Sequence, residues 1–341
     1  MSKPVILTGL RANNDLHLGN YLGALLPIVQ MQKQYAGEYQ INLFVPDLHS
    51  FTTPIDHSKL YEQTMHNVQL FVASGLDLSN NDTFVYRQSM IPAHSELTII
   101  LNCFAYMGEL NRMTQFKEKA DGKANVSVGL FGYPVLMTAD IILYGAKYVP
   151  VGADQTQHVE LARDIAIRMN NKFGELFTPP EPEKAQIAFA ESQERLRIRD
   201  LVDPTKKMSK SDESGKGVIF LGDTPETAVK KIMSATTDSF NDIKFDMKER
   251  PGISNLLAIL SALSGRELKD VIAEFEGQTQ YGPLKQATAD VVKSFLTDFQ
   301  AKFEAVDKKE VEAKLASSEE AMNVVANQTL NRVQKAVGLR K

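Results

Sequence analysis

Short apolar runs alternate with segments of helical spacing over the first half of the chain, and this alternation constrains the fold most strongly. Runs rich in Val, Ile and Phe, which are typical of strands, occupy residues 3–8, 40–46, 83–88 and 147–151. Apolar residues three and four positions apart predict helices from Tyr21 onward, at about 57–74, 94–105, 108–119 and within 130–145, where Pro134 can open the helix. This order favours an α/β protein with a doubly wound, Rossmann-like parallel sheet.

The second part of the chain has a different pattern. After Leu221 no strand-like run of any length follows, and helices are predicted at about 225–236, 252–264, 267–276, 283–304, 308–316 and 318–337. A length of 341 residues suits two domains. We therefore expect an α/β domain at residues 1–221 and an all-helical domain at 222–341. The last helices of the second domain are candidates to pack against the first domain.

Composition excludes several classes of protein. With 43% hydrophobic and 23% charged residues the chain resembles a globular protein, and no run approaches the roughly 20 apolar residues of a membrane span. The N-terminus lacks the features of a signal peptide, and Cys103 is the single cysteine, so we expect a cytoplasmic protein with no disulfide and no membrane partner. Because the net charge is -4, a nucleic acid would have to bind at a local basic patch.

A lysine-rich run, DPTKKMSKSDESGKG, occupies residues 203–217. Its Pro and Gly residues indicate a loop. Lys206, Lys207 and Lys210 place three cations within five positions, with a hydroxyl at Ser209. Mobile cations and hydroxyl donors suit a polyphosphate whose charge moves during a reaction, although a solvated basic loop is the alternative interpretation.

A second candidate anion site follows the first strand. The run GLRANNDLHLGN, residues 9–20, reads as a loop that leads into a helix, with Asn20 as the expected N-cap. A helix N-terminus offers unpaired N–H groups to an anion. His17 adds a donor, and Gly19 lets the backbone approach a ligand closely. By itself this pattern is also compatible with an ordinary helix entry.

Polar residues also follow the later strands, where ligands bind in an open parallel sheet. His49 comes soon after the strand at 40–46, and the strand at 147–151 ends in Gly152-Ala153-Asp154-Gln155. Asp140 is the one carboxylate in the apolar run 130–145. Because an unpaired buried carboxylate is costly, Asp140 should lie at the surface, be paired, or face a donor on a ligand. Residues 178–199 are polar and partly Pro-rich, and we interpret them as an excursion before the lysine-rich run.

Several of these runs resemble one known family. His17-Leu18-Gly19-Asn20 resembles the HIGH signature of class I aminoacyl-tRNA synthetases, and Lys207–Ser211 reproduces their KMSKS signature. Longer runs resemble the bacterial tryptophanyl-tRNA synthetases in particular: GNYLGAL, GELNRMTQFKEK, YPVLMTADIILY, VPVGADQTQHVELARD, LVDPTKKMSKSD and PGISNLL. They occur in family order over residues 9–260, whereas the C-terminal helices match more loosely.

The resemblance implies a two-step reaction. The carboxylate of L-tryptophan attacks the α-phosphorus of ATP, which gives tryptophanyl-adenylate and pyrophosphate. The tryptophanyl group then passes to the terminal adenosine of tRNA(Trp). No protein nucleophile is required, because positioning and charge stabilisation carry such phosphoryl chemistry. Mg²⁺ is expected to accompany ATP through phosphate oxygens and water, with no dedicated protein ligand. The resemblance also implies a homodimer and an anticodon-binding role for residues 222–341.

The resemblance assigns roles to individual residues. Catalysis is expected from Lys207, Ser209, Lys210, His17 and the mobile Lys119. ATP contacts are expected from Arg11, Ala12, Asn13, Gly19, Asn20, Gly152, Ala153, Asp154, Ile198, Lys207, Met208, Ser209, Lys210 and Ser211. The tryptophan pocket is expected to contain Asp140, which accepts the indole N–H, Tyr133 and Gln155, which bind the α-ammonium group, and Met137, Val149, Val151 and His49.

One run departs from the family. The family usually has Gln-Pro-Ser-Gly ahead of its HIGH signature, whereas this chain has Arg11-Ala12-Asn13-Asn14. Arg11 can replace the glutamine with a charged donor to a phosphate, or it can point into solvent. Two alternative functions stay open at this stage. One is the tyrosyl-tRNA synthetase, which shares the fold and the KMSKS signature of the lysine-rich run. The other is a HIGH-type nucleotidyltransferase that uses no RNA.

Overall fold

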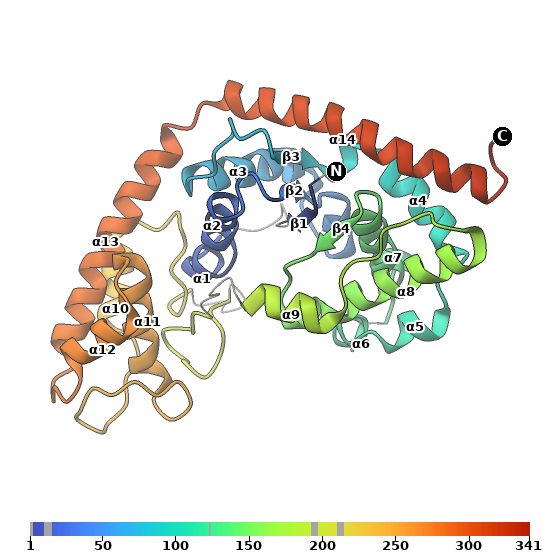
Figure 1. Ribbon diagram of the computed structural model, residues 1–341. Helices are drawn as coiled ribbons and strands as arrows, with labels where there is room; N and C mark the ends of the chain where they lie inside the picture. The colour runs from blue at the N-terminus through green and yellow to red at the C-terminus, as the bar shows by residue number, and fades with distance from the viewer. Residues whose placement is uncertain (1–2, 10–15, 123, 192–196, 210–214) are drawn as a thin grey trace.

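A four-stranded parallel sheet forms the centre of the computed structural model, which describes residues 3–9, 16–122, 124–191, 197–209 and 215–341 (Figure 1). Its strands are β1 Val5–Gly9, β2 Gln40–Val45, β3 Thr83–Arg87 and β4 Ala146–Tyr148, in the spatial order β3-β2-β1-β4. All paired strands run parallel. The predicted doubly wound α/β fold is therefore confirmed.

Helices connect and cover the strands in the order that the spacing predicts. Those in the α/β part are α1 Leu18–Asn20, α2 Leu26–Gln34, α3 Leu60–Ala73, α4 Ala93–Asn102, α5 Met107–Arg112, α6 Thr114–Ala120, α7 Val128–Ile142, α8 Thr156–Phe173 and α9 Glu183–Glu191. A π-helical turn at Tyr21–Leu25 joins α1 to α2, so one continuous helix follows β1. Short 3₁₀ turns occur at Leu48–Thr52, His57–Lys59, Gln88–Met90 and Ala153–Gln155.

Side chains alternate between the two faces of the sheet, and a hydrophobic core forms on each face. Leu43 and Val45 of β2 belong to a core that includes residues of α2 and α3. Phe44, between them in sequence, belongs to the opposite core, together with Tyr86 of β3 and residues of α4, α7 and α8. The strands are thus buried on both sides, which explains why their sequences read as nearly continuous apolar runs.

The regular elements of the C-terminal part are all helices, with a long irregular segment at residues 234–250. It consists of α10 Pro225–Met233, α11 Pro251–Ser264, α12 Leu268–Phe275, α13 Gly282–Glu304 and α14 Lys308–Ala336. Helices α10 to α13 form a bundle at one end of the molecule, and α14 runs from this bundle across the α/β part (Figure 1). The structure describes no helix that is both long and apolar enough to serve as a membrane span.

Helix α14 covers the outer edge of strand β3. The hydroxyl of Ser318 accepts a hydrogen bond from the backbone N–H of Val85 at 3.1 Å. The guanidinium of Arg87 forms a two-point ion pair with Glu319, at 2.6 and 2.8 Å. Polar groups at a sheet edge would otherwise be open to pairing with another chain. The contacts of α14 therefore protect the edge strand.

The structure corrects several predicted boundaries. His17, not Asn20, is the N-cap of α1, because its ring accepts the backbone N–H of Asn20 at 3.3 Å while Asn20 Oδ1 accepts the N–H of His17. The helix around Pro134 begins earlier, at Val128 after the capping Ser127. The helices predicted at 308–316 and 318–337 are one helix, because Ser318 bonds to β3 and does not interrupt α14. The predicted helix 108–119 is two helices, and α9 lies within the predicted excursion.

Candidate active site

The carboxyl ends of β1 and β4 define the candidate site. The strand order reverses between these two strands, and ligands of open parallel sheets bind at such a reversal. The helix that follows β1 begins at His17, which is 5% exposed. Gly152 and Asp154 follow β4 on the other side of the crevice. The structure therefore places two of the predicted nucleotide-binding segments at the same edge of the sheet.

The HIGH-like turn and the lysine-rich run lie against each other, although about 190 residues separate them in the sequence. A Cβ atom added to Gly19 would lie 3.5 Å from the Cβ of Met208 and 3.1 Å from the ring of His17. The backbone N–H of Leu18 donates to Ile219 O at 2.8 Å, and that of Leu221 donates to Leu16 O at 2.9 Å. A phosphate chain bound at the N-terminus of α1 would thus lie next to the lysine-rich run.

The lysine-rich run begins in a β-hairpin, residues 198–208, which we call the lysine hairpin. Arg199 and Lys207 lie opposite each other in an antiparallel bridge. Two backbone hydrogen bonds of 3.0 Å close the hairpin, from Met208 N to Ile198 O and from Asp200 N to Lys206 O. The side chain of Lys207 is exposed and that of Met208 is buried. The hairpin therefore anchors the run through Met208 and presents the ammonium group of Lys207 to solvent.

The segment after β4 offers polar groups to a ribose or an amine. A Cβ atom on Gly152 would lie only 2.7 Å from Oδ1 of Asp154, so the carboxylate occupies the space that a side chain would need. Gln155 Nε2 donates to the other carboxylate oxygen of Asp154 at 2.8 Å. Val149, Val151, Gly152 and Asp154 line a cleft of about 1310 Å³. That volume is ample for a nucleotide.

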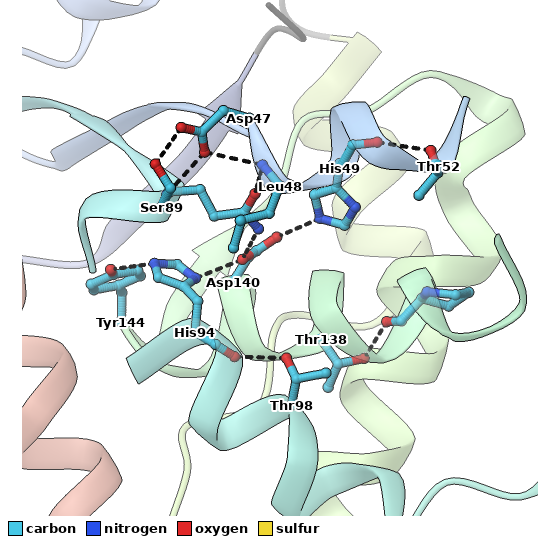
Figure 2. A network of polar contacts seen from close by, with 12 residues as sticks. Asp47, Leu48, His49, Thr52, Ser89, His94, Thr98, Thr138, Asp140 and Tyr144 are labelled. Atoms are coloured by element: carbon cyan, nitrogen blue, oxygen red, sulfur yellow. Dashed lines mark hydrogen bonds and ion pairs between the residues drawn. The ribbon is translucent and has the colours of Figure 1, made fainter. Parts of the chain in front are cut away.

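Asp140 lies in the last turn of α7 and is 1% exposed. Its Oδ1 accepts hydrogen bonds from Gln88 Nε2 at 2.7 Å and His94 Nδ1 at 2.6 Å, and its Oδ2 accepts from His49 Nε2 at 2.8 Å (Figure 2). Of the three expected environments, the structure provides pairing. The pairing alone explains why a carboxylate is buried here, and the indole contact stays a prediction.

The hydrogen bonds also keep the carboxylate of Asp140 ionised. Burial raises the pKa of Asp140, but the hydrogen bonds from His49 and His94 outweigh burial and lower the pKa from 3.8 to about 2. An ionised carboxylate only accepts hydrogen bonds, so the ring nitrogens that face it carry protons. On its other side, Nε2 of His94 lies 2.8 Å from the hydroxyl of Tyr144.

A second polar pair lies beside Asp140. The hydroxyl of Tyr133, a residue of α7, is 2.8 Å from Nε2 of His158 on α8. The ammonium of Lys119 lies 5.3 Å from the centre of the Tyr133 ring, within the range of a cation–π contact. Burial, followed by the nearby Lys119, lowers the pKa of His158 from 6.5 to about 4. His158 is therefore neutral at pH 7.

The pKa of His158 predicts how stability depends on pH. In the unfolded chain His158 takes up a proton as the pH falls through about 6.5, whereas in the folded protein it does so only near 4. Between these pH values the unfolded state binds more protons than the folded state. The free energy of unfolding should therefore fall by roughly 3 kcal/mol as the pH is lowered from about 6.5 to about 4. Urea unfolding of wild type and His158→Gln measures this contribution. We expect a shallower pH dependence in the variant, and parallel curves would contradict the prediction.

The structure locates most of the residues that the sequence proposes. Met137 and Val151 are partly buried, and they pack against the same core as Val149. Ile198 is 1% exposed, and the predicted adenine contact of its side chain is untested. Five of the predicted ATP-binding residues lie outside the described residues: Arg11, Ala12, Asn13, Lys210 and Ser211. Among the described residues, no group of three His, Cys, Asp or Glu side chains could hold a metal ion.

Sequence reasoning missed three members of the Asp140 network: Gln88, His94 and Tyr144. Gln88 follows β3 directly. Its position at the carboxyl end of a strand could have marked it as a candidate site residue. His94 comes from the first turn of α4, and Tyr144 follows α7. No local pattern links these two residues, because the packing of α4 against α7 brings them together.

Known proteins provide an independent comparison. The family of class I tRNA synthetases (W and Y) matches residues 2–297. The Tryptophan–tRNA ligase of Caldanaerobacter subterraneus subsp. tengcongensis is 45% identical over 334 residues, which is 98% of each chain. The crystal structure of tryptophanyl-tRNA synthetase from Mycoplasma pneumoniae is 35% identical, with a TM-score of 0.83 over 99% of this chain and 98% of that one.

A second solved structure carries ligands. The tryptophanyl-tRNA synthetase of Campylobacter jejuni, complexed with ADP and tryptophan, is 30% identical to this chain, with a TM-score of 0.78 over 98% of this chain and 99% of that one. The likeness covers both the α/β part and the helical part. The chain therefore belongs to the class I tRNA synthetases of the W and Y group.

Proposed function

We propose that this chain is a tryptophan–tRNA ligase. It activates L-tryptophan with ATP to tryptophanyl-adenylate and pyrophosphate, and it then transfers tryptophan to the 3′ end of tRNA(Trp). The observation that carries the proposal is the close approach of Met208 to Gly19, where an added Cβ atom would lie 3.5 Å from Met208 Cβ, because the HIGH-like turn and the lysine hairpin are then neighbours. Relatives that are named as tryptophan–tRNA ligases support the choice of amino acid.

The two sides of the site have different roles in the formation of tryptophanyl-adenylate. The phosphates and the adenosine bind to His17, Gly19 and Asn20. The ribose binds to Gly152 and Asp154. The lysine-rich run stabilises the charge that develops on the departing pyrophosphate. Mg²⁺ accompanies ATP through phosphate oxygens and water. Asp140 accepts the indole N–H from within its network, and Tyr133 and Gln155 bind the α-ammonium group.

Pyrophosphate exchange with different amino acids tests the substrate. We expect exchange that depends on tryptophan, with kcat/KM at least about 1000-fold higher than for tyrosine, because a site that hydrogen-bonds one polar group rejects a ligand that lacks it. Aminoacylation of tRNA(Trp) tests the second step. Exchange with tyrosine alone would identify a tyrosyl enzyme, and exchange without charging of any tRNA would favour a nucleotidyltransferase.

The remaining partners follow from the same proposal. Residues 222–341 bind the anticodon region of the tRNA, and residues 1–221 carry the chemistry. The enzyme acts in the cytoplasm as a homodimer. Exposed apolar side chains on and near α4 and α5 support a subunit interface there: Ile99 is 69% exposed, Tyr106 57% and Met107 66%.

A further inference from the structure

Asn255 is a buried amide that joins the helical part of the molecule to the lysine hairpin. It belongs to α11 and is 2% exposed. Its Oδ1 accepts the backbone N–H of Arg199 at 2.8 Å, and its Nδ2 donates to Arg199 O at 3.1 Å. One side chain therefore pairs with both polar groups of a single residue in the hairpin. A buried polar side chain on an otherwise apolar helix face is costly unless such bonds are made.

The geometry of the hairpin explains why Arg199 needs this partner. The hydrogen bonds that close the hairpin come from the neighbours of Arg199 and Lys207, not from these two residues. In an antiparallel pair of this kind, the polar groups of the opposed residues point away from each other. Arg199 therefore turns its N–H and C=O outward, and the amide of Asn255 takes the place of a third strand.

A second contact connects the same two parts. The backbone N–H of Thr236 donates to Leu201 O at 2.8 Å, and its hydroxyl donates to Val202 O at 2.7 Å. A side chain at Gly252, in the first turn of α11, would collide with the carbonyl oxygen of Thr236. Thr236 and α11 are thus packed closely together, and both hold the lysine hairpin.

We propose that Asn255 is a positioning residue for adenylate formation. It fixes the strand opposite Lys207, so the placement of the lysine hairpin over ATP follows the position of α11. This inference rests on the proposed function. In the part of the chain that the structure describes, Asp140 is hydrogen-bonded by His49, Gln88 and His94, none of which belongs to α11 or to the hairpin. Loss of the Asn255 contacts should therefore slow the reaction and leave tryptophan binding unchanged.

Two substitutions of Asn255 test the proposal. Asn255→Leu keeps the approximate volume and removes both bonds, and we expect single-turnover adenylate formation to slow by roughly 10- to 100-fold, as for a small misplacement of reacting groups. Tryptophan affinity should stay within about twofold of wild type, since nothing in the binding pocket has changed. The chain itself contains no tryptophan, so the fluorescence of the ligand reports its binding directly.

The second variant supplies a readout that a merely structural role would not change. Asn255→Asp keeps the acceptor for the Arg199 N–H and loses the donor to Arg199 O until its carboxyl group is protonated. Burial raises the pKa of such a carboxyl group, so the rate relative to wild type should recover as the pH falls from about 8 to about 6.

A matched control separates positioning from stability. Thr288→Val removes a buried hydroxyl of α13 that donates to Leu284 O at 2.8 Å, close to α11 but without contact to the hairpin. It should lower stability and leave the rate unchanged. An unchanged rate in Asn255→Leu, or an equal loss of rate in Thr288→Val, would overturn the proposal. If Asn255→Leu does not fold, Thr236→Val must show the selective loss of rate. Absence of tryptophan-dependent exchange in wild type would refute the proposed function instead.

Discussion

Lys207→Ala is expected to slow tryptophan-dependent pyrophosphate exchange by at least about 100-fold, the effect of one lost contact to the charge of a transition state. The side chain of Lys207 is exposed near the end of the lysine hairpin, while its backbone is fixed opposite Arg199. The charge of Lys207 is thus held at a fixed place next to the HIGH-like turn. Lys210, which lies outside the described residues, carries the same expectation from the sequence alone.

The neighbouring lysine provides the control for this prediction. Lys206 lies one position earlier, but its ammonium is 3.0 Å from Oδ2 of Asp203 in the turn of the hairpin. Lys206→Ala removes the same charge from an exposed ion pair, so exchange should change by less than about threefold. Tryptophan affinity, measured by ligand fluorescence, should be normal in both variants. Equal rates in wild type and Lys207→Ala would remove this lysine from the mechanism.

The fold class was predictable because both faces of the sheet are covered. Phe44 and its neighbours Leu43 and Val45 are all buried, so the run reads as a strand from its composition alone. The helix boundaries were less predictable, since tertiary contacts decide them. Ser318 could have ended a helix, but its hydroxyl bonds to the edge strand and the helix continues. His17 was proposed as a ligand donor, and in the structure its ring caps α1.

The site was predictable where a motif is local and not where its parts are distant. The motifs at His17 and Lys207 are continuous in sequence, whereas the network of Asp140 gathers side chains from four segments. Physical reasoning from the sequence could state that Asp140 must be paired, but it could not identify the partners. Asn255 escaped notice for a similar reason, because its partner is a backbone segment 56 residues away.

Asp140→Asn is expected to weaken tryptophan binding by about 100-fold, the upper range for a lost hydrogen bond to a charged group. It should also lower the free energy of unfolding by roughly 3 kcal/mol, because the new amide group would face donors that a carboxylate satisfied. His94→Gln is the control. It disturbs the pairing at Oδ1, which already accepts from Gln88 and His94, whereas we expect the indole N–H at Oδ2, which accepts from His49. The variant should therefore lower stability with little effect on affinity.

A tryptophan analogue with sulfur in place of the indole N–H separates the two roles of Asp140. If the carboxylate accepts the indole N–H, the analogue should bind wild type about 100-fold more weakly than tryptophan and bind Asp140→Asn as well as tryptophan does. Equal binding of both ligands to wild type would restrict Asp140 to pairing within the protein. Because its pKa is about 2, the stability that it contributes is present above about pH 3.8 and is lost as the pH falls through 2. Tryptophan affinity near neutral pH should therefore show no titration of this group.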